Sequence, residues 1–126
     1  MVNSREKGKR GELETAHLLN RLFGCNARRG QQFRGSPGSP DVITDMEGIH
    51  FEVKYVESFS LYKALDQSRR DAGEAEVPIV IHKKSRKPPV VIVELDRLPE
   101  LATAIMRHLQ KRIGIMPPGR ESQGAG

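Results

Sequence analysis

Three charged residues within a short stretch of the chain have the types and spacing needed to act on a phosphate ester. Asp41 follows a Ser-Pro pair, and Glu52 and Lys54 lie two residues apart in a Phe-Glu-Val-Lys stretch. Carboxylate oxygens select Mg²⁺ or Mn²⁺, and such an ion lowers the pKa of a bound water and stabilises charge on a scissile phosphate. A neighbouring lysine can orient that water or neutralise the transition state. Phosphodiester hydrolysis is therefore the chemistry to expect if the three side chains converge.

Convergence depends on the turn between two alternating apolar segments, 41–46 and 49–56, which read as a hairpin around Glu47-Gly48. A two-residue turn places Asp41 opposite Lys54, and a four-residue loop places it opposite Glu52; both put the trio on one face. A three-residue loop would place Asp41 on the other face unless the strand end twists. The plain alternative is a solvated strand face carrying a cross-strand ion pair.

The first helix, predicted over residues 6–23 and ending before Gly24, supplies a fourth candidate. On a wheel of 100° per residue, Glu12 falls in the apolar arc and Glu14 on the opposite side. The apolar arc is formed by Ala16, Leu19 and Phe23. An acid in a buried stripe is costly unless it is paired or metal-bound. Alternatively, Glu12 lies in the first turn, where the helix dipole favours it and solvent reaches it.

Three segments of the chain together resemble the successive motifs of the PD-(D/E)XK nuclease superfamily. They are most similar to those of archaeal-type Holliday junction resolvases and related phage enzymes, and the resemblance covers residues 7–93. The matching segments are Lys7-Gly8-Lys9-Arg10-Gly11-Glu12, Gly38-Ser39-Pro40-Asp41-Val42-Ile43 and Phe51-Glu52-Val53-Lys54.

The resemblance implies a restriction-endonuclease-like fold, with a mixed β-sheet flanked by helices, and a Mg²⁺- or Mn²⁺-dependent endonuclease. It implies that Asp41, Glu52 and the backbone carbonyl of Val53 bind the metal. Lys54 would be the catalytic lysine, and Glu12 a further ligand or organiser of a second metal. The implied products carry 5′-phosphate and 3′-hydroxyl ends.

The charge balance favours nucleic acid as a partner. Lysine and arginine number 21 against 16 acids, a net charge of +5, with solvated surface lysine as the alternative explanation. Ser36 or Ser39 would correspond to the loop serine near the scissile phosphate in the family. Gln67 is a further site candidate, with an ordinary exposed helix residue as its alternative. The predicted DNA contacts are Lys7, Lys9, Arg10, Arg28, Arg29, Arg34, Ser36, Ser39, Lys83, Lys84, Arg86 and Lys87.

Family resolvases are homodimers that cut four-way DNA junctions symmetrically, so the resemblance implies the same partner and assembly. The basic turn at residues 83–87 is longer than that pattern, which leaves junction specificity open. A nuclease of the same fold that acts on linear, flap or modified DNA would carry the same motifs. A further alternative is a non-catalytic DNA-binding module on the same fold, against which the presence of all four polar site residues argues. The charge pattern is also compatible with an RNA-directed nuclease.

The order of predicted elements is typical of an α/β protein with a mixed sheet. A strand at 28–34 and the hairpin precede a helix at 61–72, strands at 77–82 and 90–94, and a last helix capped by Asp96. We expect one domain over residues 1–113 and a disordered tail over 114–126, which is rich in proline, glycine and serine.

The expected compartment is the cytoplasm of a bacterial, archaeal or phage-infected cell. The charged N-terminus lacks the apolar stretch of a signal peptide, and no segment approaches membrane-spanning length. A single cysteine, Cys25, excludes an internal disulfide and a multi-cysteine zinc site.

Overall fold

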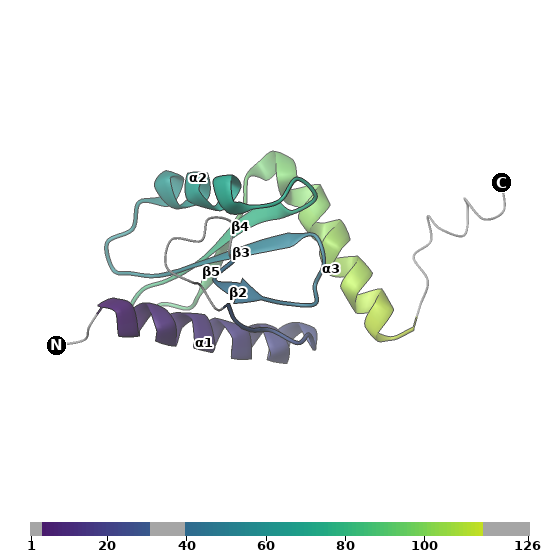
Figure 1. Ribbon diagram of the computed structural model, residues 1–126, viewed down its shortest axis with the longest axis horizontal. Coiled ribbons are helices and arrows are strands. Elements are labelled where there is room, and N and C mark those ends of the chain that lie inside the picture. The colour runs from purple at the N-terminus through teal and green to yellow at the C-terminus, as the bar shows by residue number, and fades with distance from the viewer. Residues whose placement is uncertain (1–3, 31–39, 115–126) are drawn as a thin grey trace.

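The protein has a mixed α/β architecture, as predicted (Figure 1). The computed structural model describes residues 4–30 and 40–114. Within them a five-stranded sheet is accompanied by three α-helices. In chain order the elements are α1 (Ser4–Phe23), β1 (Arg28–Arg29), β2 (Val42–Ile43), β3 (Ile49–Tyr55), α2 (Leu61–Asp71), β4 (Val77–Lys83), β5 (Val90–Ile92), a 3₁₀ turn η1 (Leu95–Arg97) and α3 (Leu98–Arg112).

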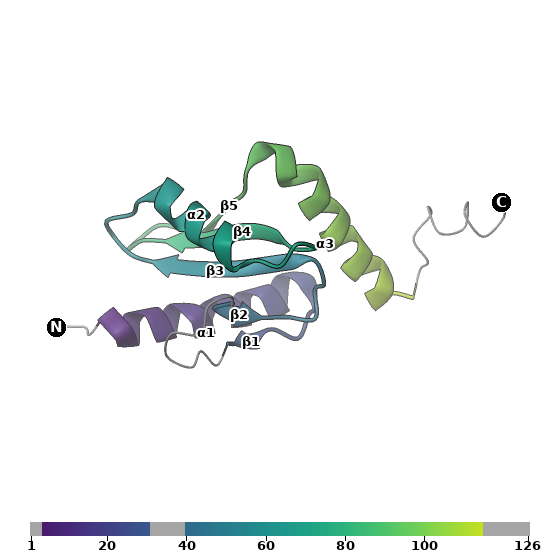
Figure 2. The ribbon, with the colours of Figure 1, turned by 45° about the horizontal axis from the view of Figure 1, so that its top comes forward.

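The strands lie in the sheet in their chain order, β1 to β5. Only β3 and β4 run parallel, in a register from Ile49 opposite Val77 to Tyr55 opposite Lys83. The other neighbouring pairs are antiparallel. A parallel pair needs a crossover connection, and α2 supplies it above the sheet in Figure 2.

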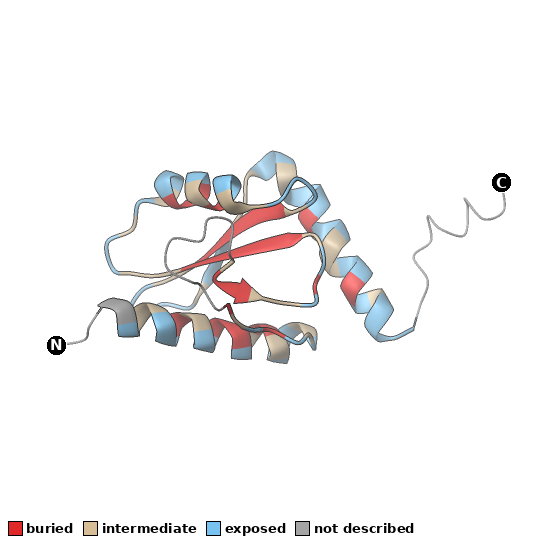
Figure 3. Cartoon of the chain, in the orientation of Figure 1, coloured by how far each residue is buried: buried red, intermediate tan, exposed pale blue. Residues whose placement is uncertain are grey.

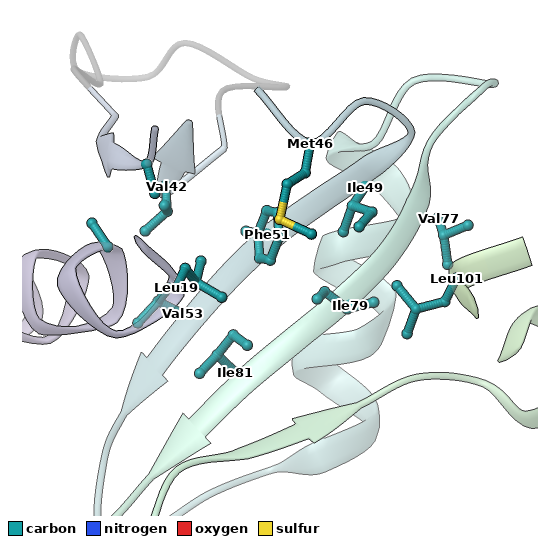
Figure 4. Packing of buried hydrophobic residues seen from close by; sticks show 12 residues of the cluster. Leu19, Val42, Met46, Ile49, Phe51, Val53, Val77, Ile79, Ile81 and Leu101 are labelled. Atoms are coloured by element: carbon teal, nitrogen blue, oxygen red, sulfur yellow. The ribbon is translucent and has the colours of Figure 1, made fainter. Parts of the chain in front are cut away.

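The sheet lies between α1 on one face and α2 on the other (Figures 1 and 2). Residues of β3 and β4 alternate between these faces, so the central strands are buried on both sides (Figure 3). On the α1 face, Phe51 and Val53 belong to the larger core cluster, to which α3 contributes Leu101 (Figure 4). On the α2 face, Val80 packs with Ala64 and Leu65. Glu52 lies opposite Val80 in the register, so its side chain is on the α2 face.

Some predicted elements differ from the observed ones or run beyond the described residues. Of the strand predicted over 28–34, Arg28–Arg29 form β1, Gly30 follows it without strand structure, and residues 31–34 lie outside the described residues, as do residues 115–126 of the tail predicted over 114–126. The prediction that Asp96 caps the last helix is wrong: Arg97 is the N-cap residue, and Asp96 lies inside η1. The Arg97 N–H donates to the Glu94 carbonyl, which adds one turn before the helix begins.

The end of α1 agrees with the prediction. Gly24 has φ of +62°, a backbone conformation that favours glycine, and its N–H donates to the Asn20 carbonyl.

None of the helices within residues 4–30 and 40–114 combines the length and the apolar character that crossing a membrane requires.

Candidate functional site

The β2–β3 hairpin brings Asp41 opposite Glu52. Val42 pairs with Phe51, and one step back along the same antiparallel register places Asp41 across from Glu52. This register corresponds to the four-residue loop over 45–48. The two-residue turn, which would have placed Asp41 opposite Lys54, is not the one formed.

Backbone groups fix the position of Asp41. Its own N–H donates to the Phe51 carbonyl at 3.1 Å, and its carbonyl accepts from Gly30 N–H at 2.9 Å. The Val53 N–H donates to Asp41 Oδ2 at 2.8 Å, so the carboxylate is held along β3. Because the strands on both sides hold this residue, its side chain has little freedom to turn toward solvent.

Glu52 and Lys54 lie on one face of β3, as strand alternation predicts. The Glu52 residue is only 2% exposed and Asp41 only 7%, so two carboxyl groups are buried together. The Lys54 side chain is partly exposed, and its Nζ lies 3.9 Å from Glu52 Oε2. The lysine therefore connects the buried carboxyl pair with the protein surface.

Glu12 on α1 interacts with this group through its charge. Its carboxylate accepts from Arg29 Nε at 2.8 Å, and its side chain is largely buried. Burial raises the pKa of Glu12 and the Arg29 hydrogen bond lowers it, with a net rise; the charges of Glu52 and Lys54 also act on it. Glu12 is thus electrostatically part of the site, and Glu14 is exposed, as the helical wheel predicts.

Burial is the main cause of the unusual electrostatics of Asp41. It raises the pKa of this carboxyl to about 7, and the negative charge of Glu52 acts in the same direction. The Val53 N–H hydrogen bond opposes the rise, while Glu12 and a side-chain hydrogen bond with Glu52 add to it. The carboxyl pair therefore resists carrying two negative charges at neutral pH.

The chemistry of these donors fits a hard divalent cation. Within residues 4–30 and 40–114, no group of three or more His, Cys, Asp or Glu side chains has a geometry that could hold a metal ion. Magnesium, however, commonly binds through one or two carboxylates and completes its shell with water and substrate phosphate. Asp41 and Glu52 supply two such carboxylates, and the backbone of Val53 lies directly against Asp41.

Glu57 links two distant basic segments at the end of the sheet where β3 ends. It accepts from Ser85 N–H at 2.8 Å and from Ser85 Oγ at 2.9 Å, and its carboxylate lies 3.5 Å from Lys7 Nζ. The β4–β5 turn and the start of α1 are thereby joined at Glu57, two residues beyond the end of β3. We call the cations of these two segments the basic rim: Lys7, Lys9, Arg10, Lys83, Lys84, Arg86 and Lys87.

The remaining predicted site residues are less close to the carboxyl pair. Arg28 is exposed on β1, whereas Arg29 pairs with Glu12, so its guanidinium has a partner within the protein. Gln67 is half-buried on α2, the helix that covers the Glu52 face. Arg34, Ser36 and Ser39 lie outside the described residues.

Sequence reasoning missed His50 and Glu76. His50 is 1% exposed, and its Nε2 lies 3.6 Å from Glu52 Oε1. Its Nδ1 lies 3.8 Å from Glu76 Oε1. The period-two alternation that groups Glu52 with Lys54 also places His50 on their face, and that signal could have identified the histidine.

Comparison of the chain with protein-family models, with curated proteins and with solved structures finds no match.

Proposed function

We propose that this protein is a metal-dependent endonuclease with a restriction-endonuclease-like fold that hydrolyses phosphodiester bonds in DNA. The observation that carries the proposal is the burial of two carboxyl groups, Asp41 and Glu52, side by side across the β2–β3 pair. Such a pair destabilises a fold unless a proton or a cation neutralises it. Lys54 on the same strand face adds the third group that phosphate chemistry requires.

The donor set suits Mg²⁺ or Mn²⁺, which Asp41, Glu52 and the Val53 carbonyl would hold. The ion would lower the pKa of a bound water and would offset the negative charge of a phosphate. The protein's own contribution begins with position, because the Val53 N–H fixes the Asp41 carboxylate on the strand that carries Glu52.

Lys54 and Glu12 would act on opposite sides of the carboxyl pair. The Lys54 ammonium, partly exposed and 3.9 Å from Glu52, can approach a phosphate oxygen and stabilise its developing charge. Glu12 on α1 accepts a hydrogen bond from Arg29 of β1. It would organise the edge of the site or bind a second ion.

DNA would enter over the basic rim. Glu57 holds the β4–β5 turn beside the start of α1, so cations from both segments border the end of β3. Clustered cations of this kind contact phosphates and position the duplex without reading its sequence.

We further propose a homodimer, because cutting two strands of a four-way junction symmetrically requires two sites. Support comes from exposed apolar side chains on the edge strand β5 and on the segment that follows it, from η1 to the end of α3. These residues are Val90, Val91, Leu95, Leu98, Met106 and Ile113. Light scattering on the purified protein should give twice the monomer mass; a monomer at micromolar concentration would contradict the dimer.

The test of the activity is cleavage of a four-way junction beside matched linear duplex, flap DNA and RNA of the same sequence, with and without Mg²⁺. We expect Mg²⁺-dependent cutting, fastest on the junction. Equal rates on junction and linear duplex would remove the junction preference and keep the nuclease. Preferred cutting of RNA would show that RNA rather than DNA is the substrate. Binding of DNA without any metal-dependent cutting would show that the protein is a DNA-binding module rather than a nuclease.

A further inference from the structure

A buried histidine faces the candidate metal ligand Glu52 from inside the protein. His50 precedes Glu52 by two residues on β3, so both side chains lie on the α2 face of the sheet. The ring is 1% exposed, and its Nε2 lies 3.6 Å from Glu52 Oε1. This position, behind the carboxylate and away from solvent, is suited to orienting Glu52 rather than to contacting a substrate.

The two facing atoms are unusual because neither has a conventional partner. Among the described residues, His50 Nε2 and Glu52 Oε1 are buried side-chain atoms without a hydrogen bond. Buried polar atoms are normally paired, and an unpaired one destabilises the fold. A hydrogen bond between these two requires an approach of only about half an ångström.

Glu76 faces the other side of the imidazole ring. Its Oε1 lies 3.8 Å from His50 Nδ1, and the same oxygen accepts from Gly73 N–H at 2.7 Å. The Gly73 contact fixes Glu76 in the connection between α2 and β4. Whichever ring nitrogen carries a proton, it faces a carboxylate oxygen, so the ring is oriented between Glu76 and Glu52.

The arrangement separates the two oxygens of Glu52. Oε1 faces His50 in the interior, whereas Oε2 lies 3.9 Å from Lys54 Nζ on the accessible side. A hydrogen bond that holds Oε1 leaves Oε2 directed toward the side where a cation and a phosphate would lie. Groups that orient metal ligands in this way affect metal affinity without touching the metal.

We propose that His50 is a positioning residue that orients the Glu52 carboxylate through Nε2, with Glu76 holding the ring from Nδ1. The inference rests on the proposed function, in which Glu52 is a ligand of Mg²⁺ or Mn²⁺.

Two substitutions separate the two ring contacts. A glutamine amide at position 50 reaches about as far as Nε2 and can donate to Glu52, whereas an asparagine amide reaches only to the place of Nδ1. We expect His50→Asn to weaken Mn²⁺ binding 10- to 100-fold, as is usual for loss of such a partner, and His50→Gln to stay close to the wild type. Isothermal titration of the full chain with Mn²⁺ measures both, and circular dichroism checks folding.

Glu76→Gln provides a second variant that is easier to accommodate, because the Glu76 side chain is 40% exposed. It should weaken Mn²⁺ binding less than His50→Asn does, while the neighbouring exposed Glu74→Gln should leave Mn²⁺ binding unchanged. If neither His50 variant folds, the comparison of Glu76→Gln with Glu74→Gln tests the positioning role. Weaker Mn²⁺ binding in Glu76→Gln alone would support the role, and equal Mn²⁺ binding in the two variants would overturn it.

Equal Mn²⁺ affinity in the Asn and Gln variants, whether both retain it or both lose it, would overturn the positioning role. That result differs from failure of the proposed function, in which the wild-type protein itself binds no Mn²⁺ and the inference falls with it.

Discussion

Asp41 is the residue at which stability and the proposed activity conflict. Its carboxyl group is buried, it lies opposite Glu52, and a backbone N–H holds it in place. Groups with strongly perturbed pKa values are common where a protein acts chemically. The pKa of about 7 therefore leads to a direct thermodynamic prediction.

Asp41→Asn should stabilise the protein at pH 8 and change its stability little at pH 4. The folded state holds the Asp41 proton more tightly than the unfolded chain, whose carboxyl has a pKa of about 3.9. The stability associated with that proton is complete below pH 4 and is lost as pH rises through 7, whereas asparagine cannot ionise. The expected gain at pH 8 is about 2–4 kcal/mol.

Chemical denaturation at both pH values measures this difference. The exposed Asp66→Asn serves as the control and should change the free energy of unfolding by less than about 0.5 kcal/mol. An Asp41→Asn protein that is less stable than the wild type at pH 8 would contradict the electrostatic account.

Mn²⁺ should raise the melting temperature of the wild-type protein more at pH 8 than at pH 6. A metal ligand must lose its proton, and burial keeps most of Asp41 protonated at pH 6. Differential scanning fluorimetry with Mn²⁺ and then with excess EDTA measures the effect, and EDTA should reverse it. The same shift at both pH values, or an undiminished shift in Asp41→Asn, would argue against Asp41 as a ligand.

At the scale of elements, close packing of α1 on β3 fixes the helix whose Glu12 interacts electrostatically with Asp41 and Glu52. A Cβ added at Gly11 would lie 2.6 Å from Tyr55 Cγ and 2.9 Å from Tyr55 Cβ, too close without movement of the helix or the ring. A Cβ at Gly8, one turn earlier on the same helix, meets nothing within 4 Å. Gly8→Ala is therefore a matched control for Gly11→Ala, because it adds the same methyl group to the same helix without a contact.

Gly8→Ala should stabilise the protein by about 0.5–1 kcal/mol, because alanine is the better helix former. Gly11→Ala should instead destabilise it by about 1–3 kcal/mol and should slow DNA cleavage, because α1 and Glu12 move away from β3. Thermal denaturation and the junction cleavage rate provide the two measurements. Faster or unchanged cleavage in Gly11→Ala would show that the position of Glu12 does not matter.

The sequence predicts most of the elements but leaves their pairing open. Apolar alternation identifies both arms of the hairpin, yet it cannot distinguish a two-residue from a four-residue loop. The loop length is decided by long-range contacts such as the Gly30–Asp41 hydrogen bond, which local patterns do not contain.

Because sequence patterns are local, only some of the site contacts could be predicted from them. The helical wheel separates Glu12 from Glu14, because helical periodicity is a local property. The Arg29 partner of Glu12 and the Glu76 partner of His50 join distant segments, so only the folded chain reveals them.

Across the whole molecule, two basic segments distant in the chain meet at one end of the sheet. The basic rim borders the end of β3, where Lys54 lies. At the other end, Lys111 of α3 lies 3.9 Å from Glu47 in the β2–β3 connection. This separation offers a control for any charge substitution.

The double substitution Lys84→Ala and Lys87→Ala should weaken DNA binding at all sequences and reduce the salt dependence. If each lysine contacts one phosphate, the slope of log K against log salt should fall in magnitude by about two. Lys111→Ala should leave both the affinity and the slope near their wild-type values. Fluorescence anisotropy across a salt series measures the slope, and a Lys111→Ala effect half as large as that of the double substitution would indicate general charge rather than an interface.

The central claim is that the buried carboxyl pair supports metal-dependent phosphodiester hydrolysis. The most direct measurement is the cleavage rate of a labelled four-way junction with Mg²⁺, for the wild type, Asp41→Ala and the control Asp66→Ala. We predict Mg²⁺-dependent cutting by the wild type and the control, and loss of cutting but retained DNA binding in Asp41→Ala. Cutting by Asp41→Ala at the wild-type rate, or no cutting of any DNA by the wild type with Mg²⁺ or Mn²⁺, would contradict the claim.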